Sequence, residues 1–293
     1  MKSIKLVLLL TLFSVNVLLA QQKKAYQLYT SSGVPIDYPQ MMETIVGADF
    51  VFFGELHNNA ISHWLQLEIT KDLFENKKTD LVLAAEMFES DNQVILDEYL
   101  GEIITKTRFE AECRLWPNYK NDYLPLVEFA KENKLAFVAS NVPRRYASLV
   151  SKKGFEGLET VSTLGQAFFP PLPIEYDPDV ACYKEMLDMG GGGMPGGGHV
   201  NNNLPKAQAL KDAAMAFFSL KEFVTGKQIL HFNGSYHSKN HEGIIWYINK
   251  YQPGLDIKVI HTVTQADVHL LEEESKGLGD FILVVDEDVT TTY

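Results

Sequence analysis

The chain has 293 residues, 46% of them hydrophobic and 22% charged, with a formal net charge of −12 at pH 7. This composition predicts an ordinary globular core, in one large domain or two small ones. The acidic balance argues against a nucleic-acid partner, because such a surface repels phosphate backbones.

The N-terminus reads as a secretory signal peptide. Basic MKSIK precedes an apolar run of about fifteen residues that ends near Ala20, and QQKK follows. The alternative, an uncleaved membrane anchor, needs roughly 20 apolar residues to span a bilayer. Removal of residues 1–20 leaves 24 basic and 38 acidic side chains, a net charge of −14. No lipidation cysteine follows the run, so we expect an exported protein, periplasmic or secreted, without a lipid anchor.

Six apolar segments along the chain predict β-strands. They lie at residues 49–53, 80–85, 135–139, 228–232, 257–261 and 281–285. Most are continuous apolar runs, which is typical of strands whose two faces are both covered. Helical patterns separate several of them, so the predicted fold class is α/β, with a mostly parallel central sheet flanked by helices. No linker or internal repeat divides the chain, and we expect one domain over residues 21–293.

Two helices are predicted most clearly. The first covers residues 60–75, where four apolar residues share one face: Ile61, Leu65, Ile69 and Leu73. Asn58 or Asn59 could cap it. The second covers residues 205–226 and begins near Pro205, a residue favoured in a first turn. Its polar face either borders a cleft or meets solvent, and it carries Gln208, Lys211, Asp212 and Met215.

Residues 189–203 read MGGGGMPGGGHVNNN, which predicts a flexible loop. The alternative is a lid that becomes ordered on a ligand. The two cysteines, Cys113 and Cys182, are either buried free thiols or a disulfide, which export would permit.

Two similar turns follow predicted strands and carry the candidate site. Gly54 and His57 form one GxxH turn, and Gly234 and His237 form the other. A third predicted strand ends at Glu86. Ligands of open parallel sheets bind at the carboxyl ends of the strands. If these strands are neighbours, four side chains converge there: Glu55, His57, Glu86 and His237.

Such a group permits two kinds of chemistry. His57, His237 and Glu86 could ligate a divalent metal. Without metal, Glu55 and the same residues could carry out acid–base catalysis. The alternative is that each histidine only bonds a carbonyl at a strand end. The chain has no GxSxG elbow, HExxH helix or phosphate-binding loop.

The segment NVPRRYASLV brings two adjacent arginines to the start of a predicted helix. In an acidic protein, Arg144 and Arg145 could clamp carboxylates such as haem propionates, with Tyr146 beside them. The alternative is that they pair with the protein's own acids.

Taken together, these motifs resemble the ChaN-like haem-binding uptake family, within a wider group that includes Tiki proteases, TraB proteins and erythromycin esterase-like enzymes. The resemblance covers roughly residues 40–265. The segments that show it are FFGELHNNAISHWLQ, AAEMFE, NYKNDYLPLVEFA, NVPRRYA, KAQALKDAAMAFF and HFNGSYH. It implies an α/β fold with the GxxH turns and a glutamate at one end of the sheet.

The resemblance implies haem binding in iron acquisition, with haem between two subunits of a homodimer and a tyrosine on the iron. Phenolate suits ferric haem, and the candidates are Tyr146, Tyr183 and Tyr236. Outer-membrane haem uptake machinery is the partner this role implies. Tiki-like relatives imply the alternative, a metal-dependent hydrolase that uses His57, His237 and Glu86.

Overall fold

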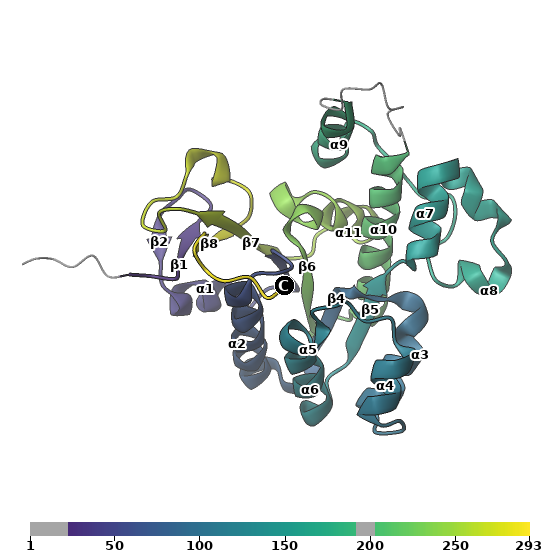
Figure 1. The fold of residues 1–293 in the computed structure, drawn as a ribbon, viewed down its shortest axis with the longest axis horizontal. Coiled ribbons are helices and arrows are strands. Elements are labelled where there is room, and N and C mark those ends of the chain that lie inside the picture. Colours follow the sequence, from purple (N-terminus) through teal and green to yellow (C-terminus); the bar gives the residue numbers. More distant parts are fainter. Residues whose placement is uncertain (1–22, 192–202) are drawn as a thin grey trace, which may run out of the picture.

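The computed structural model describes residues 23–191 and 203–293 (Figure 1). The predicted signal peptide at residues 1–20 lies outside the described residues, as do residues 192–202 of the predicted loop. Residues 189–191 are not part of a loop, because they form the last turn of helix α9 (Ala181–Gly191). In the two described ranges, no helix combines the length and apolar character that a membrane crossing requires.

Eight strands form one mixed sheet in the order β2-β1-β8-β7-β3-β6-β4-β5 (Figure 1). They are β1 (Tyr26–Thr30), β2 (Pro35–Ile36), β3 (Phe50–Glu55), β4 (Leu81–Glu89), β5 (Phe137–Asn141), β6 (Gln228–Gly234), β7 (Ile257–Gln265) and β8 (Phe281–Asp286). The strands from β8 to β5 run parallel, whereas β1 pairs antiparallel with β8 and with β2. The predicted α/β class with a mostly parallel sheet is therefore confirmed.

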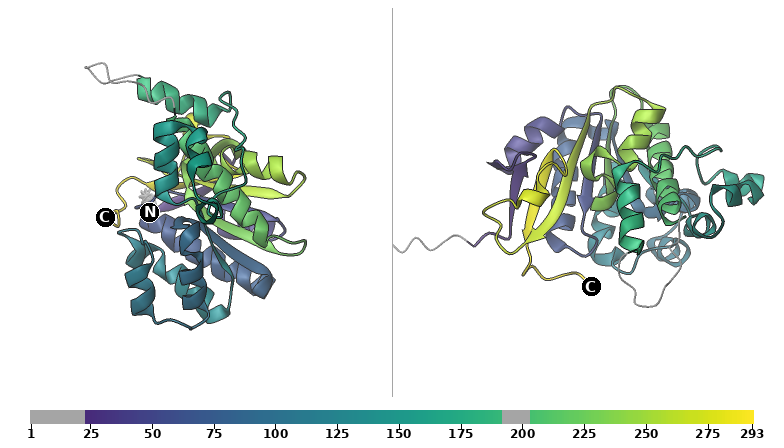
Figure 2. Two further views of the ribbon diagram at one scale, coloured as in Figure 1. Left: turned by 90° about the vertical axis from the view of Figure 1, so that its right-hand side faces the viewer. Right: turned by 90° about the horizontal axis from the view of Figure 1, so that it is seen from above.

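Helices cover both faces of the sheet (Figures 1 and 2). One face carries α1 (Tyr38–Ile45), α2 (Ala60–Lys77), α3 (Gln93–Leu100), α4 (Lys106–Glu112), α5 (Tyr119–Asp122) and α6 (Leu124–Asn133). The other carries α7 (Arg144–Lys153), α9, α10 (Leu204–Glu222) and α11 (Ile244–Tyr251). The short helix α8 (Thr163–Gln166) follows α7 at the periphery.

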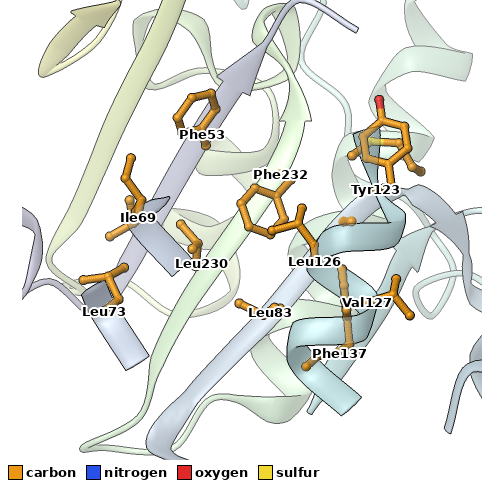
Figure 3. Close-up of a cluster of buried hydrophobic side chains, with 14 of the residues drawn as sticks. Phe53, Ile69, Leu73, Leu83, Tyr123, Leu126, Val127, Phe137, Leu230 and Phe232 are labelled. Carbon is orange, nitrogen blue, oxygen red and sulfur yellow. The ribbon is translucent and has the colours of Figure 1, made fainter. Parts of the chain in front are cut away.

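The central strands are apolar throughout because alternate side chains enter two different cores. In β3, Val51 and Phe53 pack with α2 and α6 in a first core. Phe50 and Phe52 pack with α10 and α11 in a second core, on the opposite face of the sheet. Figure 3 shows Phe53 in the first core, with residues of α2, α6 and the neighbouring strands. Burial on both faces explains why β3 reads as a continuous apolar run.

Helix α2 begins where the sequence predicted. The side chain of Asn59 accepts a hydrogen bond from the amide of Ser62, so Asn59 rather than Asn58 is the cap. Leu65, Ile69 and Leu73 are fully buried in the first core. The cap fixes the chain direction immediately after the first GxxH turn.

The two cysteines are free and buried. Cys113 belongs to one core and Cys182 to the core on the opposite face of the sheet, so they cannot form a disulfide with each other. Burial raises the pKa of the Cys113 thiol to about 12. The disulfide alternative therefore does not hold in this structure.

Candidate functional site

Three neighbouring strand ends meet at one edge of the sheet. Strand β3 pairs with β6 so that Glu55 lies opposite Gly234. Strand β4 lies on the other side of β6 and does not end at Glu86 as predicted, because it continues to Glu89. Its regular pairing with β6 stops at Ala85, and its pairing with β5 is irregular between Ala85 and Glu89, where Glu86 lies. The amide of Gly234 donates a 2.8 Å hydrogen bond to Glu86 Oε2. The strand order thus brings both GxxH turns and the glutamate together.

Glu55 is fully buried and accepts three side-chain hydrogen bonds. Its Oε1 bonds His57 Nδ1 at 2.9 Å and accepts the Tyr123 hydroxyl at 2.6 Å, while Oε2 accepts Gln66 Nε2 at 2.5 Å. Burial raises the pKa of Glu55. The hydrogen bond from His57 and the charges of nearby histidines outweigh that effect, and the pKa lies below its ordinary value. Glu55 is therefore an anion that fixes the orientation of His57.

The backbone and ring of His57 are both held in place. Its carbonyl accepts hydrogen bonds from Asn118 Nδ2 at 2.8 Å and from His63 Nε2 at 3.0 Å. Trp116 meets the imidazole edge-on, with ring centroids 4.8 Å apart. Burial lowers the pKa of His57, but the Glu55 hydrogen bond and the charge of Glu86 raise it more. Nδ1 faces Glu55, which leaves Nε2 as the nitrogen that can meet a ligand.

His237 bridges two buried carboxylates. Its Nδ1 lies 2.5 Å from Asp212 Oδ1, and its Nε2 lies 3.1 Å from Glu86 Oε1. Burial lowers the pKa of His237, but the two anions outweigh this effect and raise the pKa to about 10. Both ring nitrogens therefore carry protons at neutral pH, and His237 is a cation.

The partners of His237 come from helix α10, as the polar face of that helix indicated. Asp212 accepts from His237 Nδ1 and from the hydroxyl of Tyr183 at 2.8 Å, and Gln208 of the same helix lies beside the imidazole. Met215 on the same predicted face is fully buried and Lys211 lines a neighbouring cavity, so that face borders a cleft and the interior. Asp212 was not among the predicted site residues. The available signal was its position four residues after Gln208, which places both side chains on one face of the helix.

A cavity of about 580 Å³ opens beside these residues. Its wall combines apolar side chains with both histidines, carboxylates and two cations. The lining residues are His57, Glu86, Glu89, Trp116, Asn141, Val142, Arg144, Ala147, Ser148, Ser151, Leu204, Ala207, Lys211 and His237. Among the described residues, neither Arg144 nor Lys211 has an ion-pair partner. Burial raises the pKa of Glu86, but His237 and His57 lower it more, and Lys211 lies close enough to add to this lowering.

The other predicted cofactor residues lie outside the cavity wall. Arg145 Nη1 pairs with Asp91 Oδ2 at 2.5 Å, and its guanidinium stacks 4.5 Å from the ring of Tyr146. Tyr146 and Tyr183 are buried, and the Tyr236 hydroxyl donates to the carbonyl of Cys182. Of the two arginines, Arg144 lines the cavity and Arg145 does not.

The described residues do not support the predicted divalent metal. Within residues 23–191 and 203–293, no group of three or more His, Cys, Asp or Glu side chains could hold a metal ion. The reason is visible at His237, where both ring nitrogens donate to carboxylates and none remains as a ligand. Glu86 is likewise occupied, by His237 and by the Gly234 amide. Of the two predicted histidine ligands, His57 is the one with a ring nitrogen that no other described residue bonds.

The fold is that of an α/β protein with a cavity at the carboxyl ends of its parallel strands. Residues 41–248 match the family described as "Haem-binding uptake, Tiki superfamily, ChaN", and the chain belongs to this family. The match contains the site residues from β3, β4, β6 and α10. This family match confirms the resemblance to the ChaN-like haem-binding uptake family that the sequence motifs indicated.

Solved structures and curated proteins give three further likenesses. The chain resembles the structure "Cofacial heme binding to ChaN of Campylobacter jejuni" with a TM-score of 0.69 and 18% identity, over 90% of this chain and 98% of that one. The RRSP toxin effector domain from Vibrio vulnificus is more distant, at 15% identity and a TM-score of 0.46, over 87% of this chain and 40% of that one. Protein RETICULATA-RELATED 5, chloroplastic, of Arabidopsis thaliana is 25% identical over 128 residues, 42% of this chain and 17% of that protein. The match thus spans about one sixth of that curated relative.

Proposed function

We propose that this protein binds haem in the cavity at the carboxyl ends of β3, β4 and β6. The observation that carries this proposal is the make-up of the wall. The same cavity of about 580 Å³ is lined by apolar side chains, by the imidazole of His57 and by two cations, Arg144 and Lys211, that have no ion-pair partner within residues 23–191 and 203–293. Binding sites for small organic ligands commonly have volumes of about 300–1,000 Å³.

The chemistry of haem fits each part of this wall. The apolar side chains Trp116, Val142 and Leu204 suit the porphyrin faces. Arg144 and Lys211 would pair with the propionates, because charge-assisted bonds to carboxylates are among the stronger hydrogen bonds. Bound haem supplies the iron, and the chain's own residues hold it and limit its contact with water.

The wider role proposed is haem or iron acquisition outside the cytoplasm. The N-terminal signal-peptide pattern supports export, and the family supports uptake. A homodimer that shares haem, and an interaction with outer-membrane haem uptake machinery, are parts of this proposal. The mass of the haem-loaded protein in solution tests the homodimer. The location of the protein in fractionated cells tests its export and its association with the outer membrane.

The alternative function, a metal-dependent hydrolase, has no specific observation in its favour. It required His57, His237 and Glu86 to share a metal. Because both nitrogens of His237 are bonded to Asp212 and Glu86, His237 offers no nitrogen to a metal.

The experiment is a titration of the purified protein with ferric haem, followed at the Soret band. Ser148 is exposed and lines the cavity, so Ser148→Trp should fill the cavity without disturbing the core. Lys152→Trp adds the same side chain to the same helix outside the cavity wall and is the matched control. We expect saturable binding by the wild type and by Lys152→Trp, and at least tenfold weaker binding by Ser148→Trp. Equal affinities in all three proteins would contradict the assignment of the cavity.

A further inference from the structure

We propose that the free edge of strand β5 is a docking surface for an extended, basic segment of a partner protein. The segment would add to the sheet as one further strand. Strand β5 is the last in the sheet order, so its outer edge has no strand neighbour among the described residues (Figure 1). The residues that line this edge are different from those that line the cavity proposed for haem. The inference therefore goes beyond haem binding and does not depend on it.

The side chain of Gln93 already bonds this edge as a neighbouring strand would. Its Nε2 donates to the carbonyl of Phe137 at 2.9 Å, and its Oε1 accepts from the amide of Ala139 at 2.6 Å. One residue of a parallel strand makes the same pair of hydrogen bonds, to a carbonyl and to the amide two residues further on. These backbone groups are therefore placed for a strand. A flexible, part-exposed side chain that a peptide can displace covers them.

Residues 136–139 of this edge line a cavity of about 400 Å³. The cavity lies between the two helical layers, because its walls come from the layer of α3 and from the layer of α10. The other lining residues are Ser90, Gln93, Val94 and Asp97 on one side and Ala167, Phe168, Phe218, Lys221 and Glu222 on the other. An added strand would therefore lie where the sheet continues, with helices on both of its faces.

Two more cavities continue this one. A cavity of about 760 Å³ shares Asp97 and Ala136 with it, and a cavity of about 500 Å³ shares Ala167 and Lys221. We call the three together the edge groove. A compact small molecule fills one such cavity, whereas a peptide in extended conformation passes through several, because it advances about 3.3 Å per residue. The edge groove thus fits an extended segment of protein.

The charges along the edge groove favour a basic segment. Its lining has more acids than lysines, namely Asp97, Glu102, Glu128, Glu132 and Glu222 against Lys131, Lys134 and Lys221. Glu128 pairs with Lys106, whereas the other acids have no ion-pair partner within the two described ranges. Asp97 and Glu222 lie on opposite walls of the same cavity. Successive side chains of a strand face opposite ways, so basic residues of an added strand would meet a carboxylate on either wall.

Apolar surface is also available beside this edge. Val94, the neighbour of Gln93 in α3, is 66% exposed, and Phe168 and Phe218 are only partly buried on the opposite wall. The apolar residues of an added strand would cover these side chains. A segment in which basic and apolar residues alternate therefore matches both the charge and the apolar surface of the edge groove.

The test uses two nine-residue peptides labelled with fluorescein, one of alternating lysine and valine and one of alternating glutamate and valine. Each is titrated with the purified protein and followed by fluorescence anisotropy. We expect saturable binding of the lysine peptide and at least tenfold weaker binding of the glutamate peptide. Glu222→Lys should weaken binding of the lysine peptide about fivefold. Glu43→Lys makes the same change at an exposed residue of α1 outside the edge groove, so this control should bind as the wild type does.

Two further measurements test the addition of a strand itself. Gln93→Ala removes the side chain that the peptide must displace, so it should bind the lysine peptide about threefold more tightly. The lysine peptide is also made in two N-methylated versions, one methylated at every lysine and one at every valine. Only alternate N–H groups of an added strand face β5. One version should therefore lose binding, and the other should keep it.

Several results would overturn the proposal. They are the absence of saturable binding by the lysine peptide, equal affinities of Glu222→Lys and Glu43→Lys, an unchanged affinity in Gln93→Ala, and equal effects of the two methylation patterns. Self-association of Gln93→Ala without peptide binding would assign the edge to a second copy of this chain, and would also overturn it. The haem titration is a separate measurement, so the docking surface and the proposed function stand or fail independently.

Discussion

The buried bridge from Asp212 through His237 to Glu86 allows a quantitative prediction about stability. The change is Asp212→Asn, which keeps the shape of the side chain and removes one of the two anions that hold His237 protonated. Breaking a buried charge pair by removing one partner typically costs about 3–5 kcal/mol. We expect a loss of that size in the free energy of unfolding at pH 6.5.

The pH dependence follows from the raised pKa of His237. The charges of Glu86 and Asp212 raise the pKa of His237 from about 6.5 in the unfolded chain to about 10 in the folded protein. Because the folded pKa is the higher one, this stabilisation is complete below about pH 6.5 and is lost as the pH rises toward 10. The gap between wild type and Asp212→Asn should therefore be largest near pH 6.5 and shrink toward pH 10.

Urea denaturation between pH 6 and 10 measures both effects, with tryptophan fluorescence as the probe. The matched control is Asp280→Asn, which removes the charge from an Asp–His pair whose side chains are 31% and 40% exposed. Exposed pairs contribute about 0–1 kcal/mol. A loss in Asp212→Asn no larger than in Asp280→Asn, with an unchanged pH profile, would refute the reasoning.

Three further predictions concern the cavity and the cores. Gly234→Ala should weaken haem binding about tenfold, or about 1.4 kcal/mol, because the added Cβ would displace His57 from the cavity wall. Gly47→Ala, where a Cβ meets nothing within 4 Å, is the control and should bind haem normally in the same Soret titration. Arg144→Ala and Lys211→Ala should each weaken binding by about 1.5–3 kcal/mol, with a smaller effect at high salt; an equal loss for a haem ester without free propionates would contradict the pairing. Both buried thiols should stay unreactive toward a disulfide reagent in the native protein, and both should react in urea; rapid native labelling would contradict their burial.

Much of the sheet was predictable because its central strands are buried on both faces and read as continuous apolar runs. Strand β1 was not predicted. It is short, carries polar Gln27 between Tyr26 and Leu28, and pairs at the antiparallel side of the sheet. Its partner β2 has only two residues. Neither strand has a periodic signal long enough to separate it from a loop.

The site was predictable in its members but not in their bonding. The two GxxH turns and Glu86 could be placed at strand ends, and the order β3-β6-β4 then brings them together. Strand order is a long-range property that a local pattern does not specify. The same limit applies to Asp212, which reaches His237 from α10 and changes it from a free base or ligand into a bridging cation. Tyr123 bonds Glu55 from 68 positions away in the sequence.

The position of the iron in haem-loaded protein tests the central claim most directly. Crystals of the complex would locate it by anomalous diffraction at the iron absorption edge. The account predicts that the iron lies in the cavity at the carboxyl ends of β3, β4 and β6, whose wall includes Trp116 and Arg144. Iron outside this cavity would contradict it.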